Sequence, residues 1–302
     1  MTFTTQIKEE ITKEENNNIE DLTSLCTYLK FNATLEEDKM TVMVVNASVA
    51  RWIFKLLKTN YNVLIRLTTR TMKRFKARNL YILEVKEKLD LIYKDIDNIF
   101  KEINTSSDEE KKAFLKGMFL ACGSINDPKK NQYHLEFLVK EEEDAKLIDD
   151  LLNSLKIKSK VLKRDREYMV YVKSSENISD FIKYLGAFNA LFYFEDIRIY
   201  KDHKNMVNRL NNCEQANVER TLKSSKTILD NIKYLEDNDL TILLDDRSKE
   251  IIEYKKKYPD TSLGELAEII TMETNKSITK SGINHHFRKI NALVKKAKEN
   301  HE

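Results

Sequence analysis

The sequence KAFLKGMFLACGSINDPKKNQYHLEF occupies residues 112–137 and joins two different patterns. Its first half is mostly apolar and predicts a helix from about Glu110 to Cys122. Its second half begins an alternation that is typical of a strand, with one face formed by Tyr133, Leu135, Phe137 and Val139. The same order of helix and strands is found roughly 90–95 residues earlier, which indicates an approximate internal duplication.

Each half of the duplication mixes helices and strands. In the first half, apolar residues at helical spacing predict a helix over 46–59 with Asn46 as its N-cap. The other predicted elements are a helix near 20–31 and strands at 63–68 and 80–85, followed in the second half by a helix over 145–155, strands at 157–163 and 167–173 and a helix over 176–186. This order favours an α+β fold built from two similar units.

The composition excludes several classes of protein. Hydrophobic residues make up 41% of the 302 residues, too many for a disordered chain and enough for roughly two domains. No apolar run approaches the length of a membrane span, and the first residues lack the apolar segment of a signal peptide. Cys26, Cys122 and Cys213 are too widely spaced for a disulfide framework, so we expect a cytoplasmic protein. The net charge is only +3, and any electrostatic argument must therefore rest on local clusters.

The C-terminal third has a different pattern. Residues 200–212 are polar and indicate a junction, after which helical spacing dominates. The predicted elements are a helix over 247–258, a short helix over 262–270, a polar turn over 271–279 and a last helix over 279–298.

The last predicted helix has two unlike faces. Ile283, Phe287, Ile290 and Val294 recur at helical spacing and predict a buried face. The opposite face carries Lys280, Ser281, Asn284, His285 and Arg288. Between residues 274 and 298 there are seven basic residues and no acidic one, a strong local asymmetry in a nearly neutral chain.

A short helix, a turn and a basic helix are typical of a helix-turn-helix that enters the major groove of DNA. Lysine and arginine bind phosphates, whereas asparagine, serine and arginine can contact base edges. Two alternatives remain open. The segment could be a three-helix bundle with a merely solvated lysine-rich end, or His285 and His286 could belong to a metal site, although a third ligand is lacking.

Several long motifs identify a family resemblance. They are NRLNNCEQANVERTL at 208–222, SLGELAEII at 262–270, ITKSGINHHFRKI at 278–290 and the stretch at 112–137 quoted above. Together they closely resemble the bacterial WhiA proteins over essentially the whole chain. The resemblance implies an N-terminal domain similar to LAGLIDADG homing endonucleases, with a duplicated αββαββ unit, followed by an all-α helix-turn-helix domain.

The resemblance also implies domain boundaries and a recognition helix. We expect a LAGLIDADG-like domain over 1–203, with repeats near 15–100 and 108–200, a linker helix over 204–240 and a helix-turn-helix domain over 241–302, its motif near 261–296. The recognition helix is expected to bind DNA through Lys280, Ser281, Asn284, His285, Arg288 and Lys289.

LAGLIDADG nucleases need one carboxylate at the base of each of two helices to hold a divalent metal. Alignment of the motif with LKGMFLACG at 115–123 places Leu120 and Cys122 at the acidic positions. In the first repeat, LCTYLKFNA at 25–33 places Lys30 and Asn32 there. Neither repeat supplies the carboxylate, so we expect no catalytic residues, no metal, no cofactor and no nuclease activity. The small residues Gly117, Ala121 and Gly123 are then expected to serve close helix–helix contact.

A second basic surface is predicted on the first repeat. The strand period places Arg66 and Arg70 on one face, and the following turn adds Lys73, Arg74, Lys76 and Arg78. In the second repeat, Lys158 and Lys160 are predicted to share a strand face, followed by Lys163, Arg164 and Arg166. These clusters could contact DNA or another polyanion, or they could be the solvated face that antiparallel sheets need.

The leading expectation is therefore a non-enzymatic transcriptional regulator that binds double-stranded promoter DNA and is involved in cell division and chromosome segregation. RNA polymerase or another regulator is a further candidate partner, no membrane is expected, and the protein is expected in the cytoplasm in association with the nucleoid. The alternatives are a protein-interaction scaffold in cell division with only nonspecific DNA affinity and a residual metal-dependent nuclease.

Overall fold

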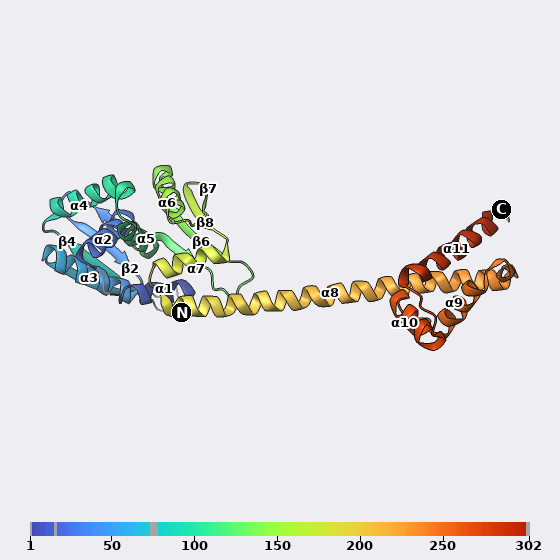
Figure 1. Cartoon of the computed structure of the whole chain (residues 1–302). Helices are drawn as coiled ribbons and strands as arrows, with labels where there is room; N and C mark the ends of the chain where they lie inside the picture. Colours follow the sequence, from blue (N-terminus) through green and yellow to red (C-terminus); the bar gives the residue numbers. More distant parts are fainter. Residues whose placement is uncertain (1, 15–16, 73–77, 300–302) are drawn as a thin grey trace. The chain divides into compact units, whose positions relative to one another are not determined.

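The computed structural model describes residues 2–14, 17–72 and 78–299 (Figure 1). Residues 72 and 78 are described by their backbone alone. The chain divides into two compact units, Met1–Asp202 and His203–Glu302. Among the residues described, no helix is both long and apolar enough to cross a membrane.

The first unit contains two similar halves, each with a four-stranded antiparallel sheet. The first half consists of α1 (Phe3–Ile11), α2 (Asn18–Asn32), β1 (Ala33–Leu35), β2 (Met40–Val44), α3 (Ala47–Tyr61), β3 (Ile65–Met72), β4 (Arg78–Val85) and α4 (Leu89–Glu102). The second half consists of a short 3₁₀ helix (Ile103–Thr105), α5 (Asp108–Cys122), β5 (Gly123–Ile125), β6 (Leu135–Val139), α6 (Glu142–Ser154), β7 (Lys160–Arg164), β8 (Glu167–Val172) and α7 (Ser175–Tyr184).

The sheet topology repeats between the halves. The strand orders are β1-β2-β4-β3 and β5-β6-β8-β7, and in both sheets all neighbouring strands are antiparallel. The predicted duplicated αββαββ arrangement and the α+β class are thereby confirmed.

Local sequence explains where the helices begin. The side chain of Asn46 accepts hydrogen bonds from the backbone N–H groups of Ser48 and Val49 at 2.8 and 3.2 Å, so it caps α3 as its sequence position predicted. At the start of α5, Ser107 and Glu110 form a reciprocal capping box. Helix α3 ends at Asn62, which adopts a left-handed conformation with φ 48°.

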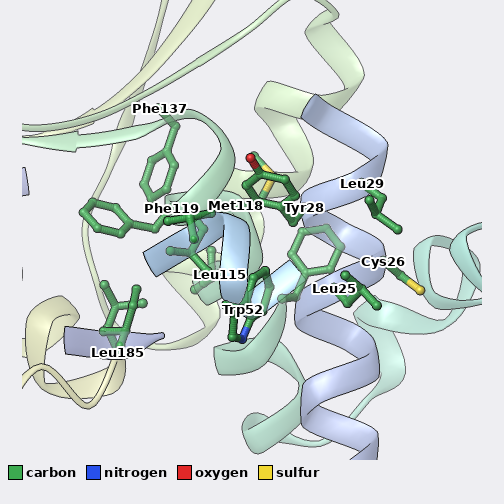
Figure 2. Close-up of a cluster of buried hydrophobic side chains, with 14 of the residues drawn as sticks. Leu25, Cys26, Tyr28, Leu29, Trp52, Leu115, Met118, Phe119, Phe137 and Leu185 are labelled. Carbon is green, nitrogen blue, oxygen red and sulfur yellow. The ribbon is translucent and has the colours of Figure 1, made fainter. Parts of the chain in front are cut away.

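Helices α2 and α5 pack closely at the centre of the first unit, where Leu25, Leu29, Leu115 and Phe119 belong to one buried core (Figure 2). The approach is close because Gly117 has no side chain. A Cβ atom there would lie 2.3 Å from the carbonyl oxygen of Ser24 and 2.8 Å from the Cβ of Thr27. The hydroxyl of Ser24 donates a hydrogen bond back to the carbonyl of Ala113 at 3.0 Å.

The prediction for the small residues is thus confirmed for Gly117 and wrong for Gly123. A Cβ at Gly123 would meet the side chain of Phe119 at 2.3 Å, within the same chain segment rather than on α2. Gly123 therefore permits the change from helix α5 to strand β5 instead of a contact between helices.

Strand β3 carries an exposed apolar residue, since Leu67 is 51% exposed. It is the edge strand of its sheet, and only one neighbouring strand, β4, flanks it.

The second unit is helical. Helix α8 (Phe188–Asp237) is shared between the two units and is followed in the second by a 3₁₀ helix (Leu240–Leu243), α9 (Asp246–Lys257), α10 (Leu263–Thr274) and α11 (Lys280–Glu299). Buried side chains of its core come from all four α-helices, among them Ile232, Ile251, Ile270 and Phe287.

Two predictions for this region can be compared with the structure. The polar stretch 200–212 contains the boundary between the two units, at Asp202 and His203, as predicted, and the backbone stays helical across it within α8 because the stretch holds no glycine or proline. Helix α10 extends to Thr274, so the turn before α11 comprises residues 275–279 and is shorter than the predicted 271–279.

We predict that Gly117→Ala lowers the free energy of unfolding of the first unit by about 1–3 kcal/mol, because the added methyl group overlaps backbone that cannot move aside. The single tryptophan of the chain, Trp52, is 5% exposed in this core, so its fluorescence during urea unfolding reports on the first unit. Gly264→Ala is the control, since a Cβ there meets only the hydroxyl oxygen of Ser262, at 3.8 Å. An unchanged Trp52 transition in Gly117→Ala would contradict the close contact.

Candidate nucleic-acid interface

Helix α11 presents the two faces that its sequence predicted. Ile283, Phe287, Ile290 and Val294 are at most 3% exposed and belong to the core of the second unit. On the other side Lys280, Ser281, His285, Arg288 and Lys289 are exposed and Asn284 is partly buried. The structure therefore brings the six predicted recognition residues to one helix, five of them open to solvent.

The five-residue turn before α11 is held by specific contacts. Asn275 ends α10 in a left-handed conformation with φ 54°. The hydroxyl of Thr271 accepts a hydrogen bond from the backbone N–H of Ile278 at 3.2 Å, and the hydroxyl of Thr279 accepts one from Gly282 N–H at 3.2 Å at the start of α11. These bonds fix the direction in which α11 leaves α10.

We predict that Thr271→Val destabilises the second unit by about 1–3 kcal/mol, because the N–H of Ile278 loses its acceptor while the side-chain volume hardly changes. Thermal unfolding followed by circular dichroism measures this loss, and the Trp52 fluorescence transition should not move. Thr227→Val is the matched control, since that hydroxyl only donates to the carbonyl of Lys223 in its own exposed helical turn. Equal effects of both substitutions would contradict the role given to Thr271.

The two adjacent histidines of α11 have different surroundings. His286 lies against α9, with Nδ1 2.8 Å from the hydroxyl oxygen of Ser248 and 3.8 Å from a carboxylate oxygen of Asp245. Burial lowers the pKa of His286, and the nearby Asp245 opposes that shift. The ring of His285 stands edge-on to His286 with 6.0 Å between centroids. His286 therefore has a packing role, whereas His285 is available to a ligand.

One recognition residue has a competing partner. The ammonium of Lys289 lies 3.5 Å from a carboxylate oxygen of Asp245, the N-cap of α9. Both side chains are about half exposed, so this ion pair is weak and can be exchanged for a phosphate contact.

The second predicted basic surface is only partly described. Arg66 and Arg70 lie on β3 opposite Glu84 and Leu80 of β4, four register pairs apart, so they share a sheet face as the strand period predicted. The Arg66 side chain is 81% exposed, and its Nε lies 3.8 Å from a carboxylate oxygen of Glu84 on the neighbouring strand. Lys73, Arg74 and Lys76 lie outside the described residues, and Arg78 is described only as the first backbone position of β4.

The second repeat places its basic residues on a short edge strand. Lys160, Lys163 and Arg164 are exposed on β7, whereas Lys158 precedes the strand and Arg166 lies in the turn after it. The shared strand face predicted for Lys158 and Lys160 is therefore not formed, because β7 begins only at Lys160.

The ends of α2 and α5, where LAGLIDADG nucleases carry their metal ligands, hold other groups here. The amide of Asn32 donates a hydrogen bond to the hydroxyl of Tyr28. Burial raises the pKa of the Cys122 thiol to about 12, which keeps it protonated and a poor ligand for a hard cation. The ammonium of Lys8, from α1, donates a hydrogen bond to the carbonyl of Leu120 at 3.0 Å.

Lys8 places a cation beside the end of α5, where the LAGLIDADG motif carries an acidic residue. Burial of the Lys8 ammonium lowers its pKa to about 8, and the neighbouring Cys122 opposes that shift. Over the part of the chain that the structure describes, no three His, Cys, Asp or Glu side chains gather as a metal site would require. The residues present do not fit a divalent metal. Sequence reasoning missed Lys8 because it lies outside both repeats and has no motif of its own.

The fold and the terminal helices define a class of protein, namely a duplicated LAGLIDADG-like unit joined to a helix-turn-helix unit. Family profiles match in the same order. The WhiA N-terminal LAGLIDADG-like domain matches residues 19–99, the WhiA LAGLIDADG-like domain matches 111–204 and the WhiA C-terminal HTH domain matches 207–294. The chain belongs to the WhiA family, and the resemblance seen in its sequence is confirmed.

Relatives of similar length support this assignment. A protein of Oceanobacillus iheyensis named "probable cell division protein WhiA" is 36% identical, over 99% of this chain and 98% of its own length. A protein of Bacillus cytotoxicus with the same name is 38% identical, over 98% of this chain and 97% of its own length.

Solved structures show the same fold. The crystal structure of full-length WhiA from Thermotoga maritima matches with a TM-score of 0.60 at 21% identity and covers 98% of this chain and 99% of its own. A structure of the N-terminal LAGLIDADG domain of WhiA matches with a TM-score of 0.50 at 22% identity and covers 61% of this chain and 92% of its own.

Proposed function

We propose that this protein is a non-enzymatic transcriptional regulator that binds promoter DNA through α11 and acts in cell division and chromosome segregation. The observation that carries the proposal is the amphipathic structure of α11, which buries four apolar side chains and leaves a basic, polar N-terminal half exposed on a helix-turn-helix. The name of the relatives, probable cell division protein, supports the cellular role. RNA polymerase or another regulator is a candidate partner, and we place the protein in the cytoplasm, on the nucleoid.

Within α11 we assign two kinds of contact. Lys280, Ser281 and Lys289 are placed to bind phosphates, which gives affinity without sequence preference. Asn284, His285 and Arg288 lie between Ser281 and Lys289 along the helix and are proposed to contact base edges in the major groove. The exposed Arg66 and Arg70 of the first unit are proposed as a further polyanion contact, with Lys73, Arg74, Lys76 and Arg78 as its continuation.

We predict that Asn284→Ala or Arg288→Ala weakens binding to the preferred sequence by about 1–3 kcal/mol and reduces the discrimination against scrambled duplexes. Gel shift on the DNA upstream of the protein's own gene measures both quantities. Lys296→Ala is the control, because Lys296 is exposed on the C-terminal part of α11, away from the proposed base contacts. If the two substitutions left specific affinity unchanged, α11 would not be the recognition helix.

The ends of α2 and α5 support the absence of nuclease activity, because they lack the carboxylates that metal-dependent phosphodiester cleavage needs. We predict that supercoiled plasmid stays intact when it is incubated with the protein and Mg²⁺, as judged on agarose gels. The same preparation must shift DNA, which shows that the protein is folded. Clean cutting that disappears in Cys122→Ala would overturn this assignment.

A scaffold role is the second candidate, and one observation favours it. Phe192, Ile199 and Met206 recur every seven residues along α8, and each is more than 60% exposed. Exposed apolar residues at this spacing are typical of a helix that contacts another protein. Sequence-independent and weak DNA binding, together with loss of the division phenotype on substitution of these three residues, would favour the scaffold over the regulator.

A further inference from the structure

The second unit contains a cavity lined mostly by polar side chains. Of the residues assigned to the recognition helix, Lys280 is the one that lines it. Its volume is about 180 Å³, far more than the roughly 30 Å³ that a water molecule occupies in the liquid. Its wall is formed by α8, by the start of α10 and by the first residue of α11, through Arg220, Ser224, Ser225, Thr261, Ser262 and Lys280.

The side chains around this cavity are basic or hydroxylic. Arg220 and Lys280 are exposed at their helix surfaces, and neither has an ion-pair partner among the described residues. Ser224 and Thr221 add hydroxyl groups from the same side of α8. Because the lining includes no carboxylate, the cavity favours an anion over a cation.

A buried lysine stands directly behind the wall. Lys255 of α9 is completely buried, and its ammonium donates hydrogen bonds to the hydroxyl of Ser225 at 2.8 Å and to the carbonyl of Thr261 at 2.7 Å. Both acceptors belong to the lining of the cavity. Over the described residues no carboxylate forms an ion pair with Lys255. Burial lowers the pKa of Lys255, and Asp260 and Glu265 oppose that shift by Coulomb attraction without contacting the ammonium.

A buried charge without an ion-pair partner in contact is costly, and an anion in the adjacent cavity would reduce that cost. The start of α10 also favours an anion in the cavity, because the N–H groups of the first helical turn carry partial positive charge. One acidic group belongs to that turn: Glu265 accepts a hydrogen bond from the N–H of Ser262 at 2.7 Å, but it does not line the cavity. Two exposed cationic side chains, Arg220 and Lys280, thus line a space whose wall includes no carboxylate, and the buried Lys255 lies behind that wall.

We propose that this cavity is a phosphate site, formed by Arg220, Ser224 and Lys280 in front of Lys255. The phosphodiester backbone of duplex DNA is its source, because Lys280 also begins the helix that we assign to the major groove. This inference rests on the proposed function and extends the interface to Arg220 and Ser224 of α8, which lie outside the helix-turn-helix. The contact would anchor the duplex without reading its sequence.

Salt dependence of DNA binding tests the proposal with the full chain. Each phosphate that a protein neutralises contributes about 0.9 to the slope of log affinity against log salt concentration on duplex DNA. Arg220→Gln should therefore reduce the slope by about 0.9 and weaken binding equally for the preferred and the scrambled duplex. Lys226→Gln is the control, because it removes one exposed positive charge from α8 without touching the cavity, and its slope should equal that of the wild type.

Ser224→Glu is a second variant, which places a carboxylate at the cavity. Ser224 is exposed on α8, so the substitution leaves the core intact, and it should reduce the slope as Arg220→Gln does. If both variants keep the wild-type slope, the duplex is not the source of the phosphate.

A second experiment uses inorganic phosphate and distinguishes duplex DNA from free phosphate as the source of the bound group. A ligand that binds only the folded state raises the melting temperature. If the slopes are unchanged but phosphate, at constant ionic strength, raises the melting temperature of the wild type and not of Arg220→Gln, the site is supported with free phosphate as its source. No effect in either arm overturns the site. A wild type that binds no duplex at all refutes the proposed function instead, and the melting arm then decides the site alone.

Discussion

Burial of one face of α11 is the constraint on which the account of this protein depends. Ile283, Phe287, Ile290 and Val294 must all enter the core of the second unit, and successive residues of a helix are rotated by about 100°. A shift of one residue would expose this face and bury Asn284 or Arg288. The hydrophobic packing therefore determines which polar side chains a nucleic acid could reach, before any electrostatic interaction is considered.

A comparable constraint preserves the first unit. Gly117 lets α5 approach the backbone of α2 at Ser24, which allows these two helices to pack closely. Asn32 and Cys122 stand at the helix ends, where the LAGLIDADG motif carries acidic residues, and Lys8 supplies a positive charge nearby. The groups at these ends can therefore differ without disturbing the core.

Elements with a long apolar period could be predicted from the sequence, as α3, α6 and α11 show. The short strands β1, β2 and β5 could not, because three to five residues carry too little periodicity to distinguish a strand from a loop. The polar stretch 200–212 indicated the boundary between the units but not the continuous helix that crosses it, because polar composition without a breaker residue does not end a helix. The recognition face of α11 could be nominated from spacing, but the environments of Lys8 and Lys255 could not, because they arise from contacts between elements distant in sequence.

The most direct measurement is the chemical reactivity of individual lysines with and without duplex DNA, read by mass spectrometry after brief acetylation of the full chain. The account predicts that Lys280 and Lys289 of α11 lose reactivity when the duplex is present, whereas the exposed Lys55 and Lys94 on helices of the first unit keep it. Unchanged reactivity of the α11 lysines under conditions where DNA is bound would contradict the claim that this helix forms the interface.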